Sequence, residues 1–237
     1  TDLITENGKV TGVVAVGETG NKVTLTAKKG VVLATGGFAA NVEMRQKYNK
    51  TWATLDASIK STNPPSSTGD GIAMATAVNA QLVQMENIQL LPMGDPNTGS
   101  LSGNIEMGVE NRIFVNDEGK RFVDEGARRD VMTNALFQQP NAHMWVILDS
   151  HDYPTGDEKN NFNESINELI AAGRAFKGET LEKLAGKIGV VPENLVAAVT
   201  EFNTHVDSKT ADSFGRTLYA DKIDKGPFYA GARVPTV

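Results

Sequence analysis

The sequence predicts an α+β fold in two domains, with a boundary near residue 86. Short runs of β-forming residues dominate the first part of the chain, whereas apolar residues recur at helical spacing after about Asn163. Between these parts, residues 92–103 are dense in Gly, Pro, Asn and Ser, which is typical of an irregular excursion. We therefore divide the chain into residues 1–86 and 87–237.

The composition excludes several classes of protein. The 237 residues carry a formal net charge of -6 and scattered basic residues, so no nucleic-acid partner is expected. The absence of cysteine excludes disulfides, iron–sulfur clusters and thiolate zinc sites. No apolar run approaches the roughly 20 residues needed to span a bilayer. We expect a soluble protein whose redox chemistry, if any, uses an organic cofactor.

The chain opens with a β pattern. Leu3 and Ile4 precede the turn residues Glu6–Lys9 and the alternating run Val10–Val16, and Asn-Gly in the turn favours a tight hairpin. A further strand is expected at Val23–Thr26. The unbroken apolar run Gly30–Thr35 indicates a strand covered on both faces.

Two helices and a loop follow in the first domain. Asn41 is placed to cap a helix over Val42–Tyr48. A second helix is expected from about Gly71 through Val78, after a loop over Ser61–Thr68 that is rich in Ser, Pro and Asn.

The second domain begins with β structure and ends with helices. A hairpin is expected from Arg112–Val115 and Lys120–Val123 around the turn Asn116–Gly119. The apolar spacing and its helix signals predict the remaining elements: a strand at Met144–Leu148, a helix around Ile166–Ile170 stopped by Gly173, a helix over Leu181–Ile188, and one from Pro192 to about Val206.

Both ends of the sequence lack the features of a natural terminus. Thr1–Thr5 shows no signal-peptide pattern and is typical of the middle of a strand, and Val234–Val237 has neither a cap nor a polar tail. We expect these residues to belong to a larger fold.

Two glycine-containing turns are candidate ligand sites. Ala34-Thr35-Gly36-Gly37 ends the apolar run, and paired glycines let the backbone approach a ligand closely. Ser67-Thr68-Gly69-Asp70-Gly71 leads into a helix, where amide groups can receive anionic or polar atoms. A plain turn and a simple helix cap are the alternatives. No complete G-x-G-x-x-G is present, since Met74 stands where its last glycine would be.

A third candidate is the charged segment Phe122–Asp130, in which Arg128 and Arg129 are flanked by carboxylates. A solvated cluster of surface ion pairs is the alternative. The three histidines, His143, His151 and His205, lack metal-ligand spacing, so no metal site is expected.

Taken in order, these segments resemble one family. ATGGF, STGDG, N-I-Q-x-x-P, then I-F-V-N-D-E-G-K-R-F-V-D-E with R-R-D, then P-F-Y-A and P-T-V are similar to the soluble fumarate reductase and urocanate reductase flavoproteins. The resemblance covers nearly the whole chain. It implies part of an FAD-binding domain, Rossmann-like with a β-meander, followed by an α+β capping domain.

The resemblance also implies the flavin site. Its FAD-lining positions fall on Ala34, Thr35, Gly36, Gly37, Thr68, Gly69 and Asp70. The family's G-x-G-x-x-G segment would precede Thr1 and its H-H-T-M-G-G segment would follow Val237. We therefore expect these residues alone to bind FAD weakly and to be inactive without the remainder of the polypeptide.

The family's reaction is hydride transfer from reduced flavin to one carbon of an activated C=C bond, with an arginine protonating the other carbon. Aligning the R-D pair places that arginine at Arg129. The resemblance also implies Glu106 as the relay or substrate-contacting carboxylate, with Glu110 as the alternative. An arginine is normally protonated throughout the accessible pH range, so such an acid needs a nearby carboxylate to restore its proton.

Two departures bear on the substrate. The family's relay arginine falls at Gly108 and its carboxylate-binding histidine at Leu91. Because leucine cannot hydrogen-bond a carboxylate, urocanate-like or other aryl acrylates fit the pocket better than fumarate. The implied partners are an unsaturated carboxylic acid and a haem or FMN electron-donor domain.

Two other functions are consistent with the residues. A dehydrogenase of the ketosteroid type shares the FAD domain but runs in the opposite direction, and the helices after Asn163 favour the reductase. A non-catalytic binding or scaffold domain would also lack the glycine fingerprint. The length of the open reading frame distinguishes an enzyme from such a domain.

Overall fold

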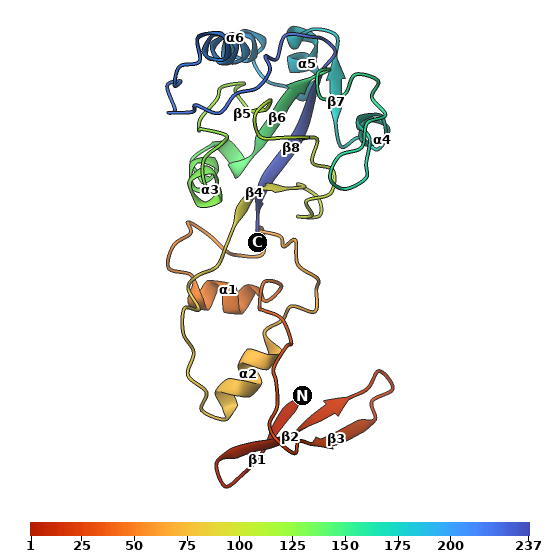
Figure 1. Cartoon of the computed structure of the whole chain (residues 1–237), viewed down its shortest axis with the longest axis vertical. Helices are drawn as coiled ribbons and strands as arrows, with labels where there is room; N and C mark the ends of the chain where they lie inside the picture. Colours follow the sequence, from red (N-terminus) through yellow and green to blue (C-terminus); the bar gives the residue numbers. More distant parts are fainter. The chain divides into compact units, whose positions relative to one another are not determined.

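The computed structural model describes residues 1–237 as a mixed helix and sheet protein, as expected for an α+β fold (Figure 1). Contacts within the chain separate two compact units. Unit 1 comprises Thr1–Ser58 and Asn63–Ile88, and unit 2 comprises Ile59–Thr62 and Gln89–Val237. No helix combines the length and apolar character required to cross a membrane.

Unit 1 contains a three-stranded antiparallel sheet in the order β1-β2-β3. The strands are β1 (Asp2–Glu6), β2 (Lys9–Val16) and β3 (Lys22–Thr26). Asn7 and Gly8 form the turn between β1 and β2 with φ values of 50° and 76°. Positive φ at both central positions is what the Asn-Gly pair favours, so the expected hairpin is confirmed.

The strand expected at Gly30–Thr35 is absent, and that prediction was wrong. These residues make no ladder, and the side chain of Val32 is 90% exposed. A strand exists only when a neighbouring backbone accepts its hydrogen bonds, and the three strands of unit 1 pair among themselves. The apolar run is therefore an irregular and largely exposed segment.

The two helices of unit 1 follow the sequence closely. Helix α1 spans Val42–Tyr48, and the Asn41 side chain accepts the Met44 N–H at 2.9 Å, as a cap does. Helix α2 spans Asp70–Ala77, and Gly69 is its N-cap residue in the left-handed conformation. Asp70 is thus the first helical residue rather than the cap.

Unit 2 is organised around a sheet in the order β4-β8-β6-β5, with β7 also paired to β8. Strand β8 pairs antiparallel with each of its three partners. The five strands are β4 (Leu91–Gly94), β5 (Ile113–Val115), β6 (Met144–Asp149), β7 (Phe176–Gly178) and β8 (Phe228–Thr236).

Alternate residues of the unit 2 sheet enter two separate cores. Met144, Val146 and Leu148 of β6 pack in one core, whereas Trp145 and Ile147 pack in the other. Successive side chains of a strand point to opposite faces, so this alternation shows that both faces of the sheet are covered.

Helices and loops cover these two faces. The first core includes residues of α3 (Arg129–Phe137) and α4 (Ile166–Ala171), and the second includes residues of α5 (Leu181–Ile188) and α6 (Pro192–Ser208). A single 3₁₀ turn, η1, spans Pro140–Ala142. The three later α-helices were expected from the sequence; α3 was not.

The expected hairpin after Arg112 forms only in part. Its turn is present, because Asn116 N–H bonds the Lys120 carbonyl at 2.9 Å. Its second arm is a single bridge between Val115 and Arg121 rather than a strand. Beyond that bridge no ladder continues, and the side chains of Arg121 and Glu125 are buried and paired with each other.

Candidate active site

The two glycine-containing turns of unit 1 lie side by side. Gly69 N–H bonds the Gly37 carbonyl at 3.0 Å, and Ala40 N–H bonds the Ser67 carbonyl at 2.9 Å. The Asn41 side-chain amide donates to the Thr68 carbonyl at 2.8 Å while its oxygen caps α1. The structure therefore brings together both segments on which the flavin positions were expected.

Glycine is required at the contact between these turns. A β-carbon on Gly71 would collide with Thr35 Oγ1, and one on Gly69, where φ is +83°, would collide with Met44. By contrast, a β-carbon on Gly37 would meet nothing within 4 Å. The turns are thus closely packed on one side while the Gly37 backbone stays open on the other, which fits close approach by a bound cofactor.

Unit 2 contains a cavity of about 330 Å³. This volume is at the lower end of the range for small-molecule sites. Its wall is formed by β4, the irregular segment 101–112, the segment before α3, the first turns of α3 and the loop before α4. The lining residues are Leu91, Pro92, Met93, Leu101, Asn104, Glu106, Val109, Arg112, Glu125, Gly126, Ala127, Arg129, Met132, Asn161 and Phe162.

Arg129 lines this cavity and is the first residue of α3. Its guanidinium makes no hydrogen bond or ion pair within the chain, whereas the neighbouring Arg128 forms an exposed pair with Asp130. Arg128 thus belongs to a surface ion pair, whereas Arg129, also exposed, lies at the cavity without a partner. An unpaired guanidinium at a cavity is available to an anionic ligand.

Glu106 lines the same cavity and forms an ion pair with Arg112. The Arg112 side chain is 4% exposed; it also donates to the Glu125 carbonyl at 3.0 Å and stacks 4.7 Å from the Phe114 ring. Burial lowers the pKa of Arg112 to about 10, and the nearby Glu125 carboxylate acts against that decrease. Glu106 and Arg112 thus form a charge pair at the cavity wall.

Glu125 also lines the cavity, but its carboxylate is already saturated. It accepts the Phe114 N–H at 3.0 Å, two bonds from Arg121 at 2.9 and 2.7 Å, and one from Arg216 at 2.8 Å. Four donors occupy the lone-pair positions of a carboxylate. Glu125 therefore has a structural role, linking β5 to Arg121 and Arg216. Glu106 is the cavity carboxylate that can still accept hydrogen bonds from further partners.

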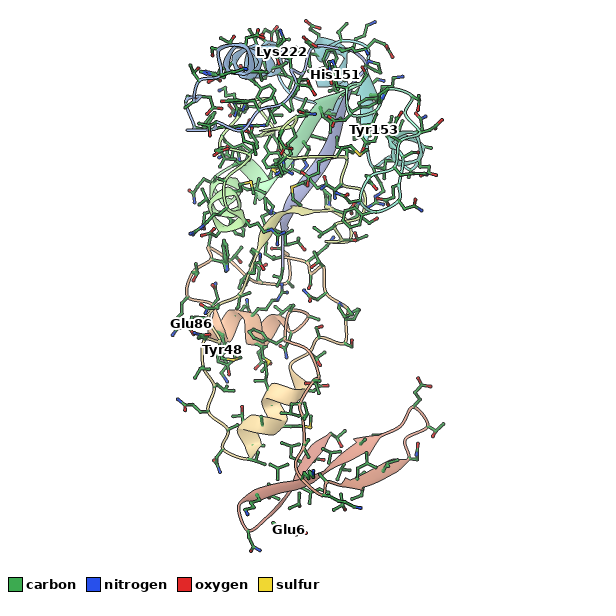
Figure 2. All side chains as sticks on the ribbon, viewed as in Figure 1. Glu6, Tyr48, Glu86, His151, Tyr153 and Lys222 are labelled. Atoms are coloured by element: carbon green, nitrogen blue, oxygen red, sulfur yellow. The ribbon has the colours of Figure 1, made fainter.

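The remaining sequence candidates lie outside the cavity. Neither Gly108 nor Glu110 lines it. The histidines make local contacts: His143 with Asp117 at 2.6 Å, His151 with Asp149 at 3.0 Å, and His205 with Thr210 at 3.0 Å. Figure 2 labels His151 in unit 2, on the segment that follows β6.

Sequence reasoning missed Arg112 as a site residue. It was assigned to a strand, and the resemblance directed attention to Gly108, where the family's second arginine would stand. One pattern could have indicated it: Arg112 directly precedes the apolar run of β5. An arginine next to a buried strand is itself often buried, and a buried charge needs a partner.

Residues 1–237 match the family described as FAD binding domain. The NADH:acrylate oxidoreductase of Vibrio harveyi is 40% identical over 237 residues, covering 100% of this chain and 23% of that protein. The urocanate reductase of Eggerthella lenta is 35% identical over 210 residues, covering 88% of this chain and 34% of that protein.

Solved structures agree in fold. The open conformation of a flavocytochrome c3 fumarate reductase matches 99% of this chain and 40% of that structure, with a TM-score of 0.74 and 29% identity. A 3-ketosteroid delta1-dehydrogenase from Sterolibacterium denitrificans matches with a TM-score of 0.68 and 25% identity, covering 98% of this chain and 46% of that one. The chain thus spans less than half the length of each protein that it matches here.

Proposed function

Because the chain belongs to the FAD binding domain family, we propose that it forms part of a flavin-dependent reductase of unsaturated carboxylic acids. The reaction reduces an activated C=C bond to CH–CH. The observation that carries this proposal is one cavity lined by an unpaired arginine and by a carboxylate paired to a second arginine.

The residues Ala34, Thr35, Gly36, Gly37, Thr68, Gly69 and Asp70 are proposed to hold the flavin. Their two turns are joined by hydrogen bonds, and the Gly37 backbone is open to a ligand. Bound FAD, once reduced, supplies the hydride that adds to one alkene carbon.

Arg129 is proposed to donate the proton to the other alkene carbon. That carbon becomes strongly basic as negative charge builds on it, so even a guanidinium is acidic enough to donate. Glu106 is proposed to return a proton to Arg129, because it is the cavity carboxylate that is not saturated by protein donors. Arg112 keeps the Glu106 carboxylate in place at the wall.

The substrate is proposed to carry an apolar group beside its carboxylate. Apolar side chains from several elements line one part of the cavity: Leu91, Met93, Leu101, Val109, Met132 and Phe162. Leu91, which stands where the resemblance places a carboxylate-binding histidine, is among them. An aryl acrylate or a urocanate-like acid uses such a surface, whereas a small dicarboxylate such as fumarate leaves it unfilled.

The donor of electrons is proposed to be another part of the same polypeptide or a haem or FMN domain. The Vibrio harveyi relative is named for NADH, and one solved relative is a flavocytochrome. These names support a donor beyond the present residues.

Reoxidation of reduced full-length protein by a panel of acids tests the function. Flavin absorbance should return with an aryl acrylate and more slowly with fumarate. Arg129→Met should abolish alkene reduction while reduction of the flavin persists, a loss of at least about 10²–10⁴-fold for removal of a general acid. Arg128→Met is the matched control, since Arg128 is exposed and does not line the cavity. Appreciable turnover by the Arg129 variant would refute the assignment of the acid.

The ketosteroid-type dehydrogenase remains the second candidate, since its structure matches this chain. A steroid that reduces the oxidised flavin, with no acid reoxidising the reduced flavin, would favour it.

A further inference from the structure

A fully buried arginine outside the cavity, Arg216, binds the backbone of the cavity wall. Arg216 lies between α6 and β8, and its side chain has no exposure to solvent. A buried guanidinium needs acceptors for all five of its N–H groups. Nε donates to the Leu218 carbonyl at 2.9 Å, and the remaining four donors point to the wall.

Three of those four donors reach main-chain carbonyls of one short segment. Nη1 donates to the Arg112 carbonyl at 2.6 Å, and Nη2 donates to the carbonyls of Val109 at 3.1 Å and Glu110 at 2.7 Å. The fourth bond runs from Nη1 to the Glu125 carboxylate at 2.8 Å. Val109, Arg112 and Glu125 all line the cavity.

The bound segment has no regular structure of its own. Residues 101–112 belong to no helix or strand, and several of their carbonyls accept hydrogen bonds from side chains distant in the sequence. The Tyr153 hydroxyl, labelled in Figure 2, donates to the Ile105 carbonyl at 2.6 Å, and the Asn160 amide donates to the Asn104 carbonyl at 2.8 Å. Arg216 donates in the same way to the carbonyls at the C-terminal end of the segment, residues 109–112.

A tight turn delivers Arg216 to this position. Asp212 Oδ1 accepts the N–H groups of Phe214 and Arg216, both at 2.9 Å, and Gly215 has a φ of +85°. Asp212 Oδ2 accepts Arg121 Nη2 at 2.6 Å. Asp212 thus shapes the turn through Oδ1, while its Oδ2 joins the ion network that saturates Glu125.

This network is electrically balanced, and Arg121 Nη1 is its one buried donor without a hydrogen-bond partner. Glu125 and Asp212 neutralise Arg121 and Arg216, which are both buried. The Arg216 guanidinium also lies 4.8 Å from the ring of Phe202. With every donor occupied, Arg216 has no N–H left for a substrate or for proton transfer.

We propose that Arg216 is a positioning residue: it fixes the Val109–Arg112 segment, and through it the Arg112–Glu106 pair, at the cavity shared with Arg129. This inference rests on the proposed function, because it assigns Glu106 and Arg129 to the reaction. A shift of about 1 Å in such a wall costs on the order of 10²-fold in rate.

The test compares Arg216→Met with Arg121→Met in the FAD-loaded full-length protein. Both changes remove a buried guanidinium from Glu125, but Arg121 donates to no carbonyl of residues 109–112. We expect Arg216→Met to lower kcat about 100-fold with a smaller change in KM, whereas Arg121→Met lowers the melting temperature similarly and keeps most of its kcat. Titration with the saturated product, followed by flavin absorbance, measures binding separately from turnover.

Arg216→Lys provides a second variant for the case in which Arg216→Met does not fold. Lysine retains a charge for Glu125, but its single nitrogen cannot reach the acceptors that the planar guanidinium spans. A stable lysine variant with low kcat supports the inference. Wild-type kcat in either Arg216 variant overturns it, as does an equal loss of kcat in the Arg121 variant or failure of both Arg216 variants to fold.

These results remain distinct from failure of the proposed function. A wild-type protein that reduces no unsaturated acid refutes the reductase assignment, and the positioning inference with it. An active wild type whose Arg216 variants are equally active removes the positioning inference alone.

Discussion

Removing the Arg112 guanidinium should destabilise unit 2 because it leaves Glu106 without its partner. The two side chains are 4% and 19% exposed, so the carboxylate would lose its ion pair in a largely desolvated position. Loss of one member of a buried pair costs about 3–5 kcal/mol, and the partial exposure of Glu106 places this case near the lower limit.

Two further effects of the substitution nearly cancel. The hydrogen bond to the Glu125 carbonyl contributes about 1 kcal/mol, and methionine at position 112 would regain about that much through burial of its apolar chain. We therefore expect Arg112→Met to lower the free energy of unfolding by about 3 kcal/mol. Glu106→Gln in the same protein should restore about 1–3 kcal/mol, because it removes the unpaired charge.

Urea unfolding of the two single variants and the double variant measures this coupling. Trp145 in β6 reports on unit 2, and a Trp52→Phe background removes the tryptophan of unit 1. The exposed pair Lys120–Glu118, at 2.8 Å, is the control and should show a coupling of only about 0.2–1 kcal/mol. Effects of the Arg112 and Glu106 changes that add to within about 0.5 kcal/mol would show that the two side chains are not coupled.

Three further predictions concern the substrate, the pH dependence and the flavin site. Leu91→His should raise kcat/KM for fumarate relative to an aryl acrylate by about tenfold, measured with both acids; an unchanged ratio contradicts the role of Leu91 in specificity. Burial raises the pKa of Asp152 to about 6 against the opposing hydrogen bond from Asn111, so its stabilising effect is present below pH about 4 and is lost as the pH rises through 6. Asp152→Asn should therefore increase the free energy of unfolding at pH 8 and leave it nearly unchanged at pH 4; an equal change at both pH values counts against this account. Gly71→Ala should reduce the flavin content retained after dialysis, because its β-carbon collides with Thr35; wild-type content would show that the contact between the turns is dispensable.

Local chemistry explains which elements were predictable. The Asn7-Gly8 turn and the Asn41 cap depend on groups within a few residues of one another, so their sequence signatures were sufficient. Gly173 likewise follows α4 with a positive φ, as expected of a helix stop. The family resemblance predicted the flavin as the ligand of the two glycine-containing turns, and it predicted roles for Arg129 and Glu106. No local pattern distinguishes those two side chains from surface charges.

Strands and buried ion pairs were harder to predict from the sequence because their partners are distant along the chain. The apolar run Gly30–Thr35 has strand composition but no ladder within these residues. Strand β8 went unrecognised since its three pairings all join it to segments far along the chain.

The amino-acid sequence alone therefore determined the fold class, the turns and most helices, and through resemblance it predicted the flavin and proton-donor positions. Only the tertiary structure decided which arginine pairs with Glu106 and which one supports the wall. Arg216 donates to the Arg112 carbonyl across 104 residues of sequence. A guanidinium selects its partners by the geometry of the folded backbone, and that geometry is set by the packing of the whole unit rather than by neighbouring residues.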